Sequence, residues 1–134
     1  MEQFWITLLS IAAGAIGYLI ATFWVRPILR YREIKYQAAS DLVYFANAIE
    51  LQKLDGSLRE DALSRMEANR RCAADLAAIY DDLPCWYRRW LHRCKEDPKQ
   101  ASSELIGLSN ESDIKEAKGR IKNVKESLRL SQKT

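Results

Sequence analysis

Residues 4–25 read FWITLLSIAAGAIGYLIATFWV, a run of 22 residues that contains no charged side chain. As an α-helix this run extends about 33 Å, which matches the roughly 30 Å thickness of the hydrocarbon layer of a bilayer. All of the charged residues except Glu2 lie after it. The sequence therefore predicts a membrane-spanning helix at the N-terminus, followed by a polar domain.

The two ends of this span carry tryptophans. Trp5 and Trp24 fall where amphipathic rings favour the headgroup layer. The alternative is a cleaved signal peptide, which needs a basic N-terminal region, a shorter apolar run and a small-residue cleavage site. No basic residue precedes the span, the apolar run is longer, and no clear cleavage site follows. We therefore expect residues 1–25 to be a retained anchor.

Residues 26–37 form a basic juxtamembrane segment that predicts the orientation. Only Glu2 precedes the span, and Glu33 is the one acidic residue among the four basic residues that follow, which are Arg26, Arg30, Arg32 and Lys35. Because positive residues stay on the cytoplasmic side, we expect the N-terminus outside and the domain in the cytoplasm. We expect these four residues, with Trp5 and Trp24, to lie at the membrane surface, where arginine attracts anionic lipid headgroups.

One side of the predicted span consists of small residues at helical spacing, namely Ser10, Gly14, Gly17 and Ala21. Small residues let two helix backbones approach closely within lipid, so this stripe favours a homo-oligomer. The alternative is that glycine and alanine are simply common in membrane helices. The span holds no ionisable residue, so an ion pathway would need many copies of the chain.

Helical periodicity continues beyond the membrane. No glycine or turn cluster follows Pro27, so the first helix is expected to run from the membrane to about Lys53, although a proline can kink it at the surface. Its apolar stripe comprises Ile28, Tyr31, Ile34, Ala38, Leu42, Phe45, Ala46 and Ile49.

Asp55-Gly56 is expected to end the first helix, and Ser57 with Glu60 forms a capping box for a second. The inner stripe of that helix comprises Leu58, Ala62, Met66, Ala73, Leu76, Ala77 and Tyr80. Two polar residues of this domain, Asp41 and Asn47, interrupt an apolar helix and are expected to be buried and hydrogen-bonded.

Three further helix starts are predicted from capping residues. Asp82 before Leu83-Pro84, Asp97 before Pro98, and Asn110 each resemble an N-cap, and Gly107 resembles a helix end. The last helix carries Ile114, Ala117, Ile121, Val124 and Leu128. We therefore expect an all-α fold, in which one N-terminal transmembrane helix continues into a small cytoplasmic helical bundle over residues 38–130.

The three cysteines, Cys72, Cys85 and Cys94, show no C-x-x-C spacing. Cys85 and Cys94 flank His92, but structural zinc needs about four ligands and a fourth is not evident. In a reducing compartment free thiols are expected. The sequence predicts neither a metal site nor a cofactor.

The stretch from Cys85 to Cys94 is the densest patch of functional side chains. Its candidate interaction residues are Trp86, Arg89, Trp90, His92 and Arg93. The first interpretation is an amphipathic helix whose tryptophans pack into the bundle. The second is a short helix that lies on the inner leaflet beside the juxtamembrane arginines. The third is contact with RNA or DNA through arginines and stacked rings.

An enzymatic reading belongs to the third interpretation. Small helical ribonucleases of the HEPN class use an Arg-x(4–6)-His motif, and Arg88 and His92, with Arg89, are similar to it. Only three residues separate Arg88 from His92, which departs from the family's spacing, and the single histidine would require a dimeric site. From residue 38 onward, 17 basic residues face 16 acidic ones, so nucleic acid is not an expected partner. No phosphate-binding loop or nucleophile motif is present either, so we expect no catalytic residues.

The run from Arg30 to Ile49 contains the pattern R-x-R-E-I-K-Y…DL-x-x-x-AN-x-I. It resembles small bacterial single-pass membrane proteins, some of which are associated with prophages or phage defence. The resemblance implies an anchored helical protein and no particular activity. We therefore expect a membrane-tethered, self-associating adaptor or accessory protein at the bacterial inner membrane, in a setting such as phage defence, with the bilayer, a second copy and a further protein as partners. An oligomeric membrane-disrupting pore is the alternative, and a HEPN-like ribonuclease is the second alternative.

Overall fold

The computed structural model describes residues 1–51, 59–111 and 113–130, and these residues form helices and short connections without a strand. The elements are α1 (Glu2–Ile20), η1 (Ala21–Val25), α2 (Arg26–Leu51), α3 (Arg59–Asp82), α4 (Cys85–Arg93), α5 (Pro98–Asn110) and α6 (Ile114–Ser127). The all-α prediction is confirmed.

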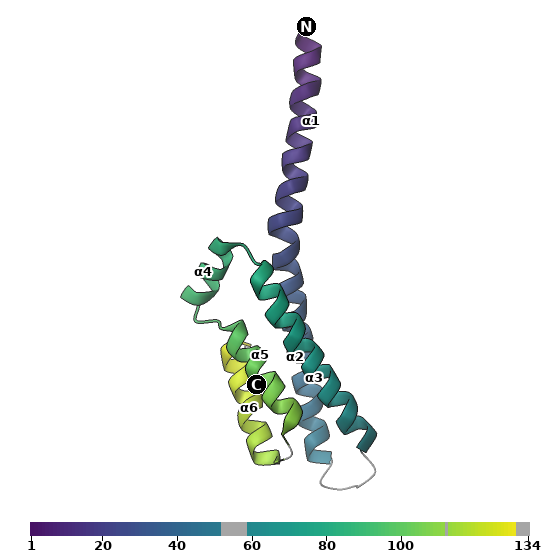
Figure 1. The fold of residues 1–134 in the computed structure, drawn as a ribbon, viewed down its shortest axis with the longest axis vertical. Coiled ribbons are helices and arrows are strands. Elements are labelled where there is room, and N and C mark those ends of the chain that lie inside the picture. The colour runs from purple at the N-terminus through teal and green to yellow at the C-terminus, as the bar shows by residue number, and fades with distance from the viewer. Residues whose placement is uncertain (52–58, 112, 131–134) are drawn as a thin grey trace.

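α1, η1 and α2 form one continuous helix, which stands out from the rest of the chain at the N-terminal end (Figure 1). By length and composition, this helix can cross a membrane, and its most apolar window has no buried residue. η1 is a π-helical turn, in which the Arg26 N–H donates to the carbonyl of Ala21. Pro27 lacks an N–H and its ring would crowd the carbonyl of Phe23 in a regular α-helix. The wider turn relieves this conflict, so the helix continues through the proline.

The bundle is built from α2, α3, α5 and α6. α3 packs along α2 and α5, and α6 packs along α5 and touches α2. Tyr31, Ile34, Ala38 and Leu42 lie on one face of α2 and are buried, as their spacing predicts. The core therefore begins at Tyr31, inside the segment described from the sequence as juxtamembrane. The other buried apolar residues are Cys72, Ala73, Leu76, Leu83, Leu91, Ala101, Leu105, Leu108, Ala117, Ile121, Val124 and Leu128.

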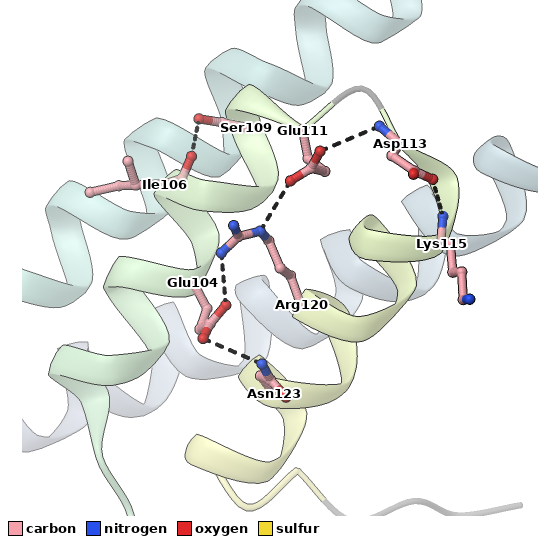
Figure 2. A network of polar contacts seen from close by, with 8 residues as sticks. All are labelled: Glu104, Ile106, Ser109, Glu111, Asp113, Lys115, Arg120 and Asn123. Atoms are coloured by element: carbon pink, nitrogen blue, oxygen red, sulfur yellow. Dashed lines mark hydrogen bonds and ion pairs between the residues drawn. The ribbon is translucent and has the colours of Figure 1, made fainter.

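Polar contacts join α5 to α6 along the rim of this core. Arg120 of α6 reaches Glu104 of α5 at 3.2 Å and Glu111, just after α5, at 3.4 Å (Figure 2). Gly107 makes room for this arginine, because a Cβ at that position would lie 2.8 Å from its Cζ. Gly107 therefore lies within α5 and does not end it, contrary to the prediction from sequence.

The helix ends test the capping predictions. Asp97 is confirmed as the N-cap of α5, since its carboxylate accepts from the Gln100 N–H at 3.0 Å. The predictions that Asp82 and Asn110 are N-caps were wrong. Asp82 is the last residue of α3, and Pro84 in an extended conformation is the N-cap of α4. Leu83 leaves the helical conformation because a residue before proline is disfavoured there.

Asn110 is the last residue of α5, and Asp113 caps α6 by accepting from the Lys115 N–H at 2.8 Å (Figure 2). The break predicted at Asp55-Gly56 and Ser57 of the capping box lie outside the described residues. So do the side chains of Phe45, Ala46, Asn47, Ile49, Leu58, Glu60, Ala62 and Ile114. Asp41 is half-buried, and desolvation raises the pKa of its carboxyl. Met66 and Tyr80 are half-buried, whereas Ala77 is exposed.

Candidate membrane-surface site

α4 is a short helix that lies apart from the main packing, at the end of the bundle from which α1 emerges (Figure 1). It ends in a Schellman motif, in which the Glu96 N–H donates to Leu91 and the Lys95 N–H donates to His92, both at 3.0 Å. Lys95 takes the left-handed conformation, with φ of 57°, that this motif requires. The cap stops α4 after nine residues and directs the chain back to the bundle.

The inner side of α4 attaches it to α2. Leu91 is 1% exposed, and Tyr87 packs edge-on against the ring of Tyr31 with a centroid distance of 6.2 Å. Tyr87 is half-buried, and desolvation raises the pKa of its hydroxyl. Because Tyr31 lies in the second turn of α2, these contacts hold α4 beside the start of that helix.

A buried polar cluster, formed by Tyr31, Lys35 and Glu96, strengthens this attachment. The Tyr31 hydroxyl donates to the Glu96 carboxylate, and Lys35 Nζ lies 2.7 Å from the same oxygen. Burial, followed by the hydrogen bond to Glu96, raises the pKa of Tyr31 well above its ordinary value. The tyrosine therefore remains a hydrogen-bond donor at every physiological pH. This cluster was not predicted from the sequence, because Glu96 lies 65 residues from Tyr31.

Lys35 differs from its predicted role at the membrane surface. Its side chain is mostly buried against Glu96, so its charge is compensated inside the domain. The three arginines of the same segment are exposed. Arg30 pairs with Glu33 at 3.0 Å, whereas Arg26 and Arg32 make no ion pair with any residue that the structure describes. The juxtamembrane arginines, defined as Arg26, Arg30 and Arg32, thus form an open basic surface.

The outer face of α4, defined as Trp86, Arg89, Trp90 and Arg93, points away from the core. Trp86 is 52% exposed and Trp90 is 50% exposed, and both arginines are exposed. The interpretation in which the tryptophans pack into the bundle was therefore wrong. α4 packs on the bundle with one side only, through Leu91 and Tyr87, so the side chains on its other side remain exposed. An open groove runs between this face and Tyr80 of α3.

Acidic groups also occur at this end of the bundle. α3 ends with Asp81 and Asp82, both exposed. Asp81 lies 3.9 Å from Lys99 of α5. Together with Glu33, these aspartates offset part of the charge of the juxtamembrane arginines and of Arg88, Arg89 and Arg93. The groups named here comprise six arginines and three acidic residues, so together they carry a net positive charge.

The anchor residues singled out from the sequence all face outward in the single chain. Trp5 and Trp24 are exposed near the two ends of the span. On the small-residue stripe, the Ser10 hydroxyl donates to the carbonyl of Ile6 at 2.9 Å. A Cβ at Gly14 or Gly17 would meet no atom within 4 Å. Contacts within the described chain therefore do not require glycine at these positions.

The thiols have different environments. Cys72 is buried in the core, and desolvation raises its pKa to about 11. Cys85 is exposed at the start of α4, where the hydrogen bond from Arg88, at 3.3 Å, lowers its pKa. Arg88 also lies 6.0 Å above the ring of Tyr80, whereas His92 is exposed. In the described part of the chain, no group of three or more His, Cys, Asp or Glu side chains is arranged to hold a metal ion.

No family model, curated protein or solved structure matches this chain. What this chain can do is therefore inferred from its own geometry. That geometry combines a helix that can cross a membrane, a bundle built directly onto it, and a basic, tryptophan-bearing helix beside the junction. Such groups are suited to contact with lipid headgroups and to docking of a macromolecule.

Proposed function

We propose that this protein is a membrane-tethered, self-associating adaptor, without enzymatic activity, at the bacterial inner membrane. Its anchor crosses the bilayer with the N-terminus outside, and its helical bundle recruits or regulates a further protein at the cytoplasmic surface. The resemblance of the Arg30–Ile49 region favours a setting in prophage function or phage defence.

The observation that carries this proposal is the continuity of the first helix. The helix from Gln3 to Tyr44 contains the uncharged span and also contributes Tyr31, Ile34 and Leu42 to the bundle core. A hinge between anchor and domain would let the bundle turn freely, whereas a continuous helix holds it at one distance and orientation. An adaptor requires a surface that is held at a fixed position, whereas a freely diffusing enzyme does not.

The topology is testable with the exposed thiol of Cys85. The basic residues after the span support a cytoplasmic domain. A membrane-impermeant maleimide added to intact spheroplasts should leave Cys85 unlabelled, and the same reagent should label it once the membrane is opened. Labelling in intact spheroplasts would overturn the orientation, and recovery of the chain in the soluble fraction would overturn the anchor.

Self-association is expected through Ser10, Gly14, Gly17 and Ala21. A mass measurement on the detergent-solubilised chain should show an oligomer, and Gly14→Leu with Gly17→Leu should reduce it to the monomer. Ala12→Leu makes the same kind of change on the opposite side of the helix and should leave the oligomer intact. A wild-type monomer would remove self-association from the proposal.

Two results would replace the adaptor with another function. Loss of membrane potential on induced expression, abolished by Gly14→Leu or Gly17→Leu, would identify an oligomeric pore. A cellular effect lost in His92→Ala, together with RNA cleavage, would identify a ribonuclease. The adaptor predicts an intact membrane potential and no effect of His92→Ala on RNA.

A further inference from the structure

The outer face of α4 remains unexplained by folding. Its two tryptophans keep about half of their surface exposed, and its two arginines make no ion pair with a described residue. Exposed tryptophan is costly for a soluble surface, but it is favoured at a bilayer interface, where the ring has both an apolar and a polar environment. The composition of this face fits a short interfacial helix.

The position of α4 places this face near the bilayer. Tyr31, which contacts Tyr87 of α4, lies six residues after Val25 at the end of the span. Six residues correspond to about 9 Å along the helix axis, and the headgroup layer extends about 5–8 Å beyond the hydrocarbon. A helix is about 10 Å wide, so α4 lies at the depth of the headgroups or directly beneath them. Figure 1 shows it at the same end of the bundle as the emerging anchor.

The charge around α4 complements an anionic leaflet. α4, which carries the outer-face arginines, lies at the end of the bundle where α2, with the juxtamembrane arginines, begins (Figure 1). The acidic side chains at this end are fewer, and Glu33 and Asp81 have cationic partners. Leu29, also exposed at the start of α2, adds apolar surface to the same region.

We propose that α4 is a second membrane contact, and that its outer face binds an anionic phospholipid surface beside the anchor. This inference rests on the anchoring described above. Leu91 and Tyr87 keep the inner side of α4 on the bundle, while Trp86 and Trp90 enter the headgroup layer. Arg89 and Arg93 bind phosphate groups. Two points of attachment fix the tilt of the anchor and bundle, as one unit, relative to the membrane and therefore decide which surface faces a cytoplasmic partner.

A lipid surface fits better than nucleic acid. The chain from residue 38 onward is nearly neutral, with 17 basic and 16 acidic residues, so the excess of basic residues lies in residues 26–37, next to the span. A groove for a nucleic acid would need a basic track that continues beyond four residues of one short helix.

The four tryptophans of the chain provide the test. In a variant with Trp5→Phe and Trp24→Phe, the outer face of α4 holds the only tryptophans. This full-length variant is reconstituted into phosphatidylcholine vesicles, with or without phosphatidylglycerol, and lipids brominated near the carbonyl groups serve as quenchers. We expect quenching and a blue-shifted emission in the vesicles that contain phosphatidylglycerol, and weaker effects at high salt.

Charge reversal tests the arginines. Each arginine near an anionic surface contributes about fivefold to binding, so Arg89→Glu with Arg93→Glu should lower the bound-to-free ratio of α4 by at least about 25-fold. The matched control is Arg71→Glu with Lys115→Glu, which makes the same change in charge away from α4 and should preserve quenching. Equal quenching in both pairs would overturn the role of Arg89 and Arg93.

The complementary variant, with Trp86→Phe and Trp90→Phe, reports on the anchor alone. If Trp5 and Trp24 are quenched while the α4 tryptophans are not, the anchor is correct and the α4 proposal is wrong. If neither pair is quenched, the anchoring itself has failed. Quenching of the α4 tryptophans by poly(U) and not by brominated lipid would also overturn the proposal, in favour of a nucleic-acid site.

Discussion

α4 and α6 are both short helices that end in a Schellman motif with a non-glycine residue in the left-handed position. They differ in the use of their apolar residues. α6 places Ala117, Ile121 and Val124, with its C-cap Leu128, in the core. α4 buries only Leu91 completely and leaves both tryptophans half exposed.

This difference separates a helix that is explained by packing from one that is not. Full burial of a large apolar side chain contributes about 1.5–3 kcal/mol to stability, and α6 gains this contribution at several positions. At Trp86 and Trp90, much of this stabilisation is absent in the single chain, because the side chains stay half exposed. The tryptophans of α4 therefore point to a partner surface, whereas the apolar residues of α6 are explained by the fold.

The largest expected effect concerns thiol reactivity. Cys85 begins α4 and has a lowered pKa, whereas burial raises that of Cys72 to about 11. Cys85 is also exposed and Cys72 is buried, so at neutral pH Cys85 should be alkylated roughly 100-fold faster or more. Peptide mass spectrometry after timed alkylation of the native chain measures both rates.

The pH dependence of this reaction has a defined sign. A lowered pKa keeps the thiolate at lower pH, so labelling of Cys85 should reach its plateau below the pH of an ordinary thiol. Arg88→Gln should move that midpoint upward. Comparable rates at Cys72 and Cys85 would show that α4 is not more open than the core.

A second prediction concerns core packing. Leu128→Ala should lower the free energy of unfolding by about 2–5 kcal/mol, because it leaves a cavity beneath α6. Trp90→Ala removes more atoms but should cost only about 1 kcal/mol, since its main internal contact is stacking on Tyr87 at 5.3 Å. Urea unfolding of the detergent-solubilised chains, followed by circular dichroism, gives both values. A larger loss for Trp90→Ala would abolish the distinction between the two helices.

A third prediction addresses the attachment of α4 to α2. Tyr31→Phe removes one of the two partners of the buried Glu96 carboxylate and should cost about 1.5–3 kcal/mol. Tyr36→Phe, on the exposed side of the same helix, should be nearly neutral. Equal unfolding midpoints for the two variants would show that the buried cluster does not stabilise the bundle.

The smallest effect compares the two helix caps. The Lys95 side chain forms no hydrogen bond with another described residue that would favour its φ of 57°, so Lys95→Gly should stabilise the chain by about 0.5–1 kcal/mol. Arg129, with φ of 47°, also donates to the Cys94 carbonyl at 2.9 Å. Arg129→Gly should therefore give a smaller gain or none. Thermal unfolding of the two variants measures the difference, and a greater gain at Arg129 would contradict this account.

Local patterns predicted much of this architecture. The apolar spacing of Tyr31, Ile34 and Leu42 identified the buried face of α2, and Asp97 before Pro98 identified the start of α5. Both signals lie within one helical turn or in a regular period. Where two local signals competed, the wrong one was chosen. Asp82 resembled an N-cap, but Pro84 forced a break between it and the next helix.

The site was less predictable than the fold. The sequence identified Trp86, Arg89, Trp90 and Arg93 as a patch, but burial of the tryptophans depends on tertiary packing. The role of Lys35 depended on Glu96, which is 61 residues away. The only local sign was that Tyr31 and Lys35 lie four residues apart on a helix face that is otherwise apolar, and such a pair needs a buried polar partner.

The π-helical turn at Ala21–Val25 affects how the small-residue stripe is rotated about the helix axis relative to the outer face of α4. It holds one residue more than an α-helical turn, and each residue rotates a helix by about 100°. The small-residue stripe and the outer face of α4 therefore have a fixed angular relation around a common axis. Loss of its extra residue would leave an ordinary helical turn and nearly the same alignment, whereas loss of a residue from the α-helical stretch between Arg26 and Tyr31 would rotate the stripe by roughly a quarter of a circle relative to the bundle. In the proposed oligomer, neighbouring copies would then present different sides of their domains to one another.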